Sequence, residues 1–299
     1  MTESRKWKGK TGGSIWGQWG LIVFFKLLDV RLGYLLMALV VPFYMFFSYK
    51  NYKAIYHFFR RQLALSLWKS FMKTYVNHYR FGQVILDRFL IFARRKNPFE
   101  IEVVGNEHFN RLIEGEKGFI IASSHIGNFE IGGYLLRSEK KRINALVYPG
   151  ETETVQKHRA KVLNRNNIHL IPVSDDMSHL FAIHTALQKG EIVSMPCDRN
   201  LGSPKCVECD FLRGKADFPV GAFAIATTLD LEVLSIFVMK ESSKKYAVHV
   251  KPVAIETPEA QESKQERTAR YVRSFVNEVE AIVRRYPEQW FNYYEFWKQ

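Results

Sequence analysis

From residue 99 onward the sequence alternates between short apolar runs rich in β-branched residues and longer segments with helical periodicity. Runs this short indicate strands rather than helices, and apolar strands that alternate with helices are typical of a parallel sheet. The runs are residues 99–104, 118–122, 143–148, 168–173, 192–195, 233–239 and 246–250, and the helical segments are 127–138, 153–164, 176–189, 219–228 and 262–286. This alternation predicts an α/β fold with a mostly parallel central sheet flanked by helices.

The amino-terminal third has a different character. Residues 1–96 contain 17 Lys and Arg against three acids, a net charge of +14, whereas the rest of the chain has a net charge of −1. Residues 32–49 carry no charge and reach the lower limit of length that spans a hydrocarbon core, although Pro42 should kink or shorten a helix there. We therefore divide the chain into a basic, apolar, membrane-associated helical region, residues 1–96, and an α/β domain, residues 97–299.

So basic a region points to a polyanionic partner: nucleic acid, an anionic membrane or an acidic protein. An apolar run that adjoins a basic, aromatic-rich stretch favours a membrane with anionic lipids. No nucleic-acid recognition motif is present, so we expect no nucleic acid as partner. A buried core helix followed by a solvated basic helix is the alternative. Whether the run spans the bilayer or lies in its interface stays open, as does the oligomeric state.

The segment after the second predicted strand, SSHIGNFE at residues 123–130, carries the most chemistry. Ligands of open α/β sheets bind at the carboxyl ends of strands, where His125 stands. Gly127 permits a close approach, and backbone N–H groups at a helix start favour negative charge. If His125 lies in the turn, Glu130 can hold its imidazole in one tautomer. Such a pair without a nearby nucleophile predicts a general base acting on a substrate hydroxyl, whereas the ordinary alternative is a helix-start histidine and a surface acid.

This segment resembles the His-x4-Asp/Glu motif of glycerolipid-type acyltransferases. It most resembles the branch that contains the late lipid A (lauroyl/myristoyl) acyltransferases and related predicted bacterial acyltransferases. Residues 195–226 resemble the Asp-Arg and Phe-Pro-x-Gly blocks of that branch, and residues 286–297 resemble its Gln-Trp ending. The opening residues and the apolar run resemble its membrane-anchoring start, so the resemblance covers nearly the whole chain.

The resemblance implies a membrane-bound acyltransferase at the bacterial inner membrane, with its catalytic domain facing the cytoplasm. A fatty acyl chain would pass from an acyl thioester, on acyl carrier protein or coenzyme A, to a hydroxyl or amine of a lipid or glycolipid. No other cofactor is implied, and acidic acyl carrier protein becomes a second possible partner of the basic third. A non-catalytic lipid- or carrier-protein-binding module on the same fold is the alternative.

The resemblance also implies roles for individual residues. His125 would be the general base and Glu130 its orienting partner. The residues implied to bind substrate are Gly127, Asn128, Asp198, Arg199, Pro219 and Gly221. Among them Arg199 is the best candidate for an anionic group, although a structural Asp–Arg pair is an equal alternative.

Two departures from the family pattern bear on the acceptor. Glycerol-phosphate-using relatives carry Glu between the Pro and Gly of this block, where this chain has Val220. The lipid A enzymes usually end in an Arg-rich Trp motif, where this chain has residues 292–297, NYYEFW. The sequence therefore leaves the acceptor open.

A competing idea comes from Cys206 and Cys209, which form a CxxC with Cys197 upstream. The surrounding residues are typical of a strand, in which positions three apart point to opposite faces. Because a zinc site needs further ligands and no second pair is present, we expect no metal site. Three cysteines without a disulfide pattern suit a reducing compartment.

Overall fold

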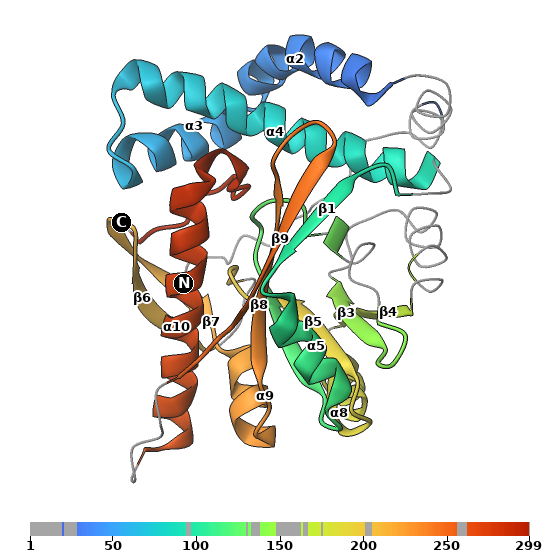
Figure 1. Ribbon diagram of the computed structural model, residues 1–299. Helices are drawn as coiled ribbons and strands as arrows, with labels where there is room; N and C mark the ends of the chain where they lie inside the picture. Colours follow the sequence, from blue (N-terminus) through green and yellow to red (C-terminus); the bar gives the residue numbers. More distant parts are fainter. Residues whose placement is uncertain are drawn as a thin grey trace.

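Seven strands build the central sheet of the computed structural model (Figure 1). They are β1 Glu100–Val104, β2 Phe119–Ser123, β3 Ile143–Val147, β4 Ile168–Pro172, β5 Ile192–Pro196, β8 Val233–Lys240 and β9 Lys245–Pro252. Their order is β1-β9-β8-β2-β5-β3-β4, and neighbouring strands are parallel except for β8 and β9. The mostly parallel sheet is therefore confirmed, and each predicted strand lies at its expected place.

The structure describes residue 20 and residues 29–93, 97–129, 131–132, 138–147, 163, 167–174, 176–200, 205–255 and 262–298. The predicted helix at 153–164 lies almost entirely outside these residues. The predicted helix at 127–138 is described only at residues 129, 131 and 132 in helical form.

The described helices of the α/β body are α5 Asn106–Glu114, α8 Ser178–Gln188, α9 Gly221–Leu229 and α10 Lys264–Arg285. Three of them confirm the predicted helices at 176–189, 219–228 and 262–286, whereas α5 has no predicted counterpart. The start of α10 is set by a capping box, in which Ser263 and Glu266 satisfy each other's backbone N–H groups. A separate antiparallel ribbon consists of β6 Cys206–Phe211 and β7 Gly214–Pro219.

Each face of the sheet has its own hydrophobic cluster, as buried strands require. β2 shows the division, because Ile120 and Ala122 join the cluster with α9 and α10. The alternate residues Phe119 and Ile121 join the cluster with α5, α2 and α4. This alternation follows from the two-residue period of a strand. Packing on both faces holds the end of β2, and hence the residues that follow it, between two packed layers.

The amino-terminal region forms α2 Val30–Phe47, α3 Tyr49–His57, a π-helical turn at Phe58–Gln62 and α4 Leu67–Ala93. The apolar run is thus a helix, and α2 continues through Pro42 to Phe47. Figure 1 shows α2 and α4 at one end of the sheet, beyond β1 and β9.

α2 lies antiparallel beside α4. Tyr34, near the start of α2, hydrogen-bonds to Asp87 near the end of α4, and the carbonyl of Ala38 accepts from the hydroxyl of Tyr75 earlier in α4. Tyr34 also shares a hydrophobic cluster with Tyr246 of β9. The helical region therefore packs directly on the α/β body.

Candidate active site

A His–Asp pair lies at the carboxyl edge of the sheet. β2 and β5 are parallel neighbours, with Ser123 beside Pro196, so the residues that follow them meet at this edge. The backbone N–H of His125 donates to Oδ2 of Asp198 at 2.8 Å. Nδ1 of His125 lies 2.8 Å from Oδ1 of the same carboxylate. The structure thus brings together two residues that the sequence places 73 positions apart.

The environment of this pair favours a charged carboxylate beside a reactive imidazole. The side chain of Asp198 is fully buried, while that of His125 is 18% exposed. Burial acts to raise the pKa of the Asp198 carboxyl, but His125 and Arg199 outweigh burial and hold this pKa below its usual value. An ionised Asp198 stabilises the tautomer that carries its proton on Nδ1. Nε2 then has a free lone pair, and within the described residues it has no hydrogen-bond partner.

Arg199 lies beside the pair and is held by neutral groups. Its Nε donates to Oδ1 of Asn292 at 2.6 Å, and an Nη atom donates to the carbonyl of Phe291 at 3.0 Å. The Asn292 amide also reaches Oδ2 of Asp198 at 3.4 Å. Burial lowers the pKa of the Arg199 guanidinium, with Asp198 acting in the opposite direction. Asn292 therefore bridges the acidic and the basic residue of this site.

The segment after α10 completes the site, and the sequence assigned it no role in the chemistry. The N–H of Phe291 donates to the carbonyl of His125 at 3.0 Å. Trp290 forms an isolated β-bridge with Ile126, and the N–H of Gly127 donates to the carbonyl of Gln289. No local signal could reveal these contacts, because they join segments that are far apart in the chain. The Gln-Trp ending was the only sequence hint.

Gly127 and Asn128 both make contacts that hold this loop in place. The N–H of Gly127 donates to the carbonyl of Gln289, and the N–H of Asn128 donates to the carbonyl of Val238. Neither N–H is therefore free to stabilise a developing negative charge. Gly127 has φ +63, and a Cβ there would stand 2.2 Å from the carbonyl oxygen of Val238. Close packing on β8 thus requires a glycine at this position. The Asn128 side chain is buried, with its amide donated to Tyr246 and its oxygen accepting from Ile131.

The remaining predicted residues lie elsewhere or outside the described chain. Glu130 is outside the described residues. Pro219 ends β7 and Gly221 begins α9, so they stand at the strand-to-helix turn that the sequence suggests. Among the described hydrogen bonds and ion pairs, none joins them to His125.

The cysteine pattern forms no described metal centre. Cys209 on β6 is buried and Cys206 is partly exposed, as expected for strand positions three apart. Burial raises the pKa of the Cys209 thiol to about 11. In the part of the chain that the structure describes, no three His, Cys, Asp or Glu side chains gather as metal ligands would.

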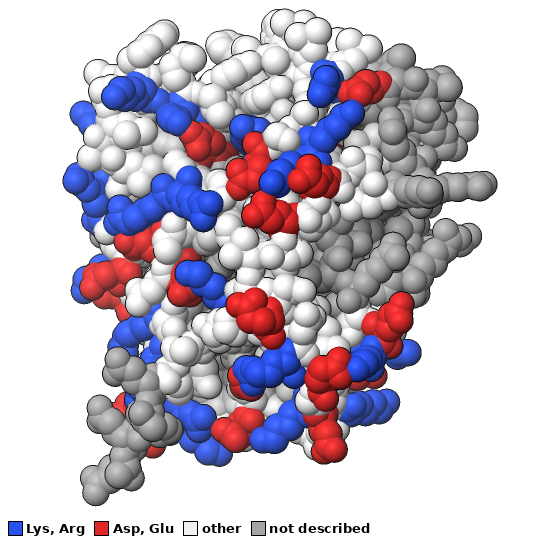
Figure 2. Space-filling view, in the orientation of Figure 1, with Lys and Arg blue, Asp and Glu red and all other residues white. Residues whose placement is uncertain are grey.

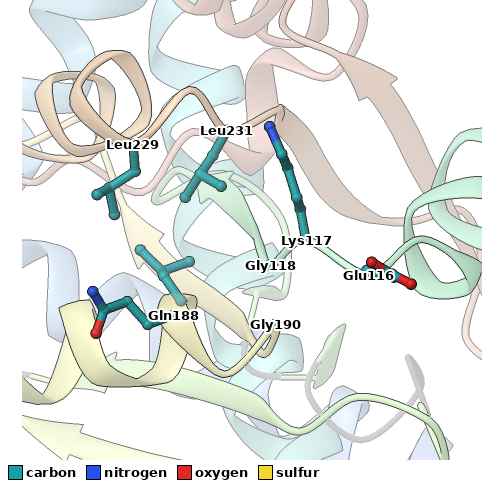
Figure 3. Close-up of a pocket in the computed structure, with 8 residues that line it drawn as sticks. Glu116, Lys117, Gly118, Gln188, Gly190, Leu229 and Leu231 are labelled. Atoms are coloured by element: carbon teal, nitrogen blue, oxygen red, sulfur yellow. The ribbon is translucent and has the colours of Figure 1, made fainter.

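A pocket of about 280 Å³ lies at the opposite edge of the sheet (Figure 3). Gly118 and Gly190, which precede β2 and β5, line it together with Leu187, Leu229 and Leu231. Because His125 follows β2, this pocket stands at the other end of the strand. It is therefore separate from the His–Asp pair.

Comparison with known proteins shows what the chain as a whole is similar to. The family model described as bacterial lipid A biosynthesis acyltransferase matches residues 71–299. The chain is also similar to the crystal structure of the 1-acyl-sn-glycerophosphate (LPA) acyltransferase PlsC from Thermotoga maritima. That similarity has 15% sequence identity and a TM-score of 0.38, and it covers 85% of this chain and 98% of that chain. No curated protein sequence matches the chain.

Proposed function

The chain belongs to the bacterial lipid A biosynthesis acyltransferase family, and from this premise we propose a specific acyl transfer at the His125–Asp198 pair. The proposed reaction moves a fatty acyl chain from an acyl thioester to a hydroxyl or amine of a lipid or glycolipid. The donor is acyl carrier protein or coenzyme A. The observation that carries the proposal is the imidazole of His125, bonded at Nδ1 to a buried carboxylate and free at Nε2 among the described residues.

This geometry supports a direct transfer with a general base. Nε2 of His125 removes the proton from the acceptor as its oxygen or nitrogen attacks the thioester carbonyl. The tetrahedral intermediate collapses, the C–S bond breaks, and the thiolate takes the proton back from the imidazolium. Asp198 stabilises that imidazolium, as the carboxylate of a catalytic triad does. A thiol leaves readily, so no covalent enzyme intermediate is needed.

The role of Asp198 differs from the substrate contact that the resemblance implies. Its carboxylate is fully buried and its oxygens bond to His125 and Asn292, so we assign it to orienting the base. Arg199 keeps its proposed contact with an anionic group of the acceptor or of the phosphopantetheine arm. Glu130 keeps its proposed role as a carboxylate that orients the base. Separate substitutions at Glu130 and Asp198 distinguish the contributions of the two residues.

Membrane attachment through α2 belongs to the same proposal. In the described chain, α2 is the one helix long and apolar enough to cross a membrane. Its exposed side chains include Leu35, Leu39, Phe43, Phe46 and Phe47. Figure 2 shows few charged side chains along the upper rim, where α2 lies in Figure 1. These features support contact with hydrocarbon.

The packing of α2 favours a position in the interface rather than across the bilayer. α2 lies beside α4 from Tyr34 to at least Ala38, and α4 carries Lys73, Arg80 and Arg88. A helix pair with these charges is costly in a hydrocarbon core. The exposed apolar residues at the start of α4, Leu67, Trp68, Phe71 and Met72, fit the same interface. The bacterial inner membrane and a cytoplasmic catalytic face complete the proposal, and the acceptor stays a lipid or glycolipid.

The decisive experiment combines lipid mass spectrometry with one substitution. Cells that lack the gene should lose one acyl chain from a specific lipid, and the wild-type gene should restore it. His125→Ala should fail to restore it while the protein still accumulates and sediments with membranes. Restoration at the wild-type level by His125→Ala would reject catalysis and favour a non-catalytic binding module.

A further inference from the structure

A fully buried polar cluster joins four separate elements behind the active-site loop. It consists of Tyr34 on α2, Asp87 on α4, Lys240 at the end of β8 and Tyr246 on β9, all less than one-tenth exposed. Asp87 accepts hydrogen bonds from Tyr34, Tyr246 and Lys240. Lys240 also donates to the hydroxyl of Tyr34 at 3.0 Å. We call these four residues the Asp87 cluster.

The cluster is costly to bury, and its stability comes from saturation of its polar groups. Burial raises the pKa of the Asp87 carboxyl and lowers that of the Lys240 ammonium, because desolvation outweighs their mutual attraction. The three donors to Asp87 offset this cost, as do the aromatic rings around Lys240. Such a buried pair adds little net stability over an apolar core, but it specifies how the elements meet.

The cluster reaches the active-site loop through one hydrogen bond. The amide of Asn128 donates to the hydroxyl of Tyr246 at 3.1 Å. The side-chain oxygen of Asn128 accepts from the N–H of Ile131 at 3.2 Å and so caps the helical turn after the loop. Tyr246 thus holds Asn128, the last residue of the loop from His125 to Asn128, in place.

A second connection to the loop runs from the backbone of Lys240 through Gln289. The backbone N–H of Lys240 donates to Oε1 of Gln289, whose own amide donates back to the carbonyl of Lys240. The carbonyl of Gln289 accepts from the N–H of Gly127. The side chain of Tyr246 and the backbone of Lys240 therefore reach the loop at Asn128 and, through Gln289, at Gly127.

We propose that the Asp87 cluster positions His125 for acyl transfer, through Tyr246 and Asn128, and ties that position to the membrane-facing helix α2 through Tyr34. This inference rests on the proposed function for its kinetic consequence. The cluster residues act as positioning residues, because none of them is placed at the reacting atoms.

The test compares three single-hydroxyl deletions in the full-length protein. Tyr246→Phe should lower kcat by roughly 10- to 100-fold at unchanged KM, since a misplaced base loses rate rather than binding. Tyr34→Phe should lower kcat by a smaller factor. Tyr75→Phe is the matched control: it also removes a hydroxyl between α4 and α2, but its partner is the Ala38 carbonyl, which has no described path to His125. Its kcat should equal that of the wild type.

A mutant cycle separates positioning from loss of folded protein. Asn128→Ser keeps an oxygen for the helix cap and removes the donor to Tyr246. Combined with Tyr246→Phe, it should cause no further loss in kcat, because both changes remove the same bond. Additive losses would overturn the proposed link, as would a wild-type kcat for Tyr246→Phe.

A readout without turnover keeps the inference independent of the proposed function. In histidine-labelled ¹⁵N NMR spectra, the His125 signal is identified by its loss in His125→Ala. The Nδ1–H signal should broaden or exchange faster in Tyr246→Phe and stay unchanged in Tyr75→Phe. An unchanged signal in Tyr246→Phe would overturn the positioning role. If the wild type transferred no acyl group, the function would fail while this measurement still decided the inference.

Discussion

Nδ1 of His125 lies 2.8 Å from Oδ1 of Asp198, and the same carboxylate accepts the backbone N–H of His125 at 2.8 Å. Two bonds from one buried carboxylate fix both the ring and the backbone of the proposed base. Among the described residues, this relationship sets the orientation of the imidazole. The predictions below follow from it and from its surroundings.

The first prediction concerns the orienting carboxylate. Asp198→Asn should lower kcat by at least about 100-fold, because an amide can donate to Nδ1 and favour the wrong tautomer. Steady-state kinetics with an acyl thioester donor would measure the loss, and Glu130→Gln is the parallel variant. If Glu130→Gln gave the larger loss while Asp198→Asn stayed near the wild-type kcat, the orienting role would belong to Glu130.

The second prediction concerns stability in acid. The pKa of Asp198 is lower in the folded protein than its unfolded value of about 3.9. A lowered pKa contributes stability that is fully present above about pH 4 and is lost as pH falls through the folded pKa. The free energy of unfolding should therefore fall less steeply below pH 4 in Asp198→Asn than in the wild type. Denaturant titrations between pH 3 and pH 6 would measure both slopes, and equal slopes would contradict the expected linkage.

The third prediction concerns Asn292, which the sequence did not single out. Asn292→Leu removes the acceptor of the Arg199 Nε atom and the donor to Asp198. A hydrogen bond to a charged group contributes about 1.5–3 kcal/mol, so kcat/KM should fall by about 10- to 100-fold. Asn292→Gln, which keeps the amide, should lose less. Wild-type kcat/KM in Asn292→Leu would show that Arg199 needs no such support.

The fourth prediction concerns the packing of the active-site loop. Gly127→Ala should destabilise the fold by at least about 2 kcal/mol, because it combines a left-handed backbone with a clash against the carbonyl of Val238. Gly221→Ala is the control, since a Cβ there meets nothing within 4 Å. Thermal unfolding midpoints of both variants provide the comparison. Equal midpoints would mean that the loop can shift away from β8 at little cost.

The fifth prediction concerns the membrane. Phe46→Ser combined with Phe47→Ser should move a measurable part of the protein from the membrane fraction to the supernatant, since each exposed ring contributes about 1.5–3 kcal/mol of transfer free energy. Phe181→Ser is the control, because this exposed ring lies on α8, far from α2 in Figure 1. Unchanged sedimentation of the double variant would place the contact elsewhere.

A labelling experiment separates the two membrane positions of α2. Single cysteines that replace Arg31, near the start of α2, and Lys50, just past its end, should react with an impermeant maleimide from the same side of the membrane. The wild type gives the background from its native cysteines. Labelling from opposite sides would show that α2 spans the bilayer.

The sequence predicted the sheet well because a strand buried on both faces has a local signature. The runs that became β2 and β5 are almost wholly apolar, with Ser194 the polar exception in the run 192–195, and their lengths and flanks indicate strands. The same reasoning located His125 at the carboxyl end of β2. The motif order and the match over residues 71–299 agree on the acyltransferase family.

The sequence could not predict which side chains meet at that edge. It paired His125 with nearby Glu130, which lies outside the described residues, and assigned Gly127 and Asn128 to substrate binding. The structure adds Asp198 and Asn292 to this edge from distant segments. Contacts of this range depend on strand order and on the return of the chain after α10, and no local pattern records either.

The sequence by itself determined the strands of the central sheet, the family and the edge at which His125 stands, because periodicity and motifs act over a few residues. The tertiary structure decided the partners of His125, the reason for Gly127 and the position of α2 along α4. Burial is the physical reason: a carboxylate such as Asp198 or Asp87 can leave water only where several donors converge, and those donors come from segments that only the fold brings together.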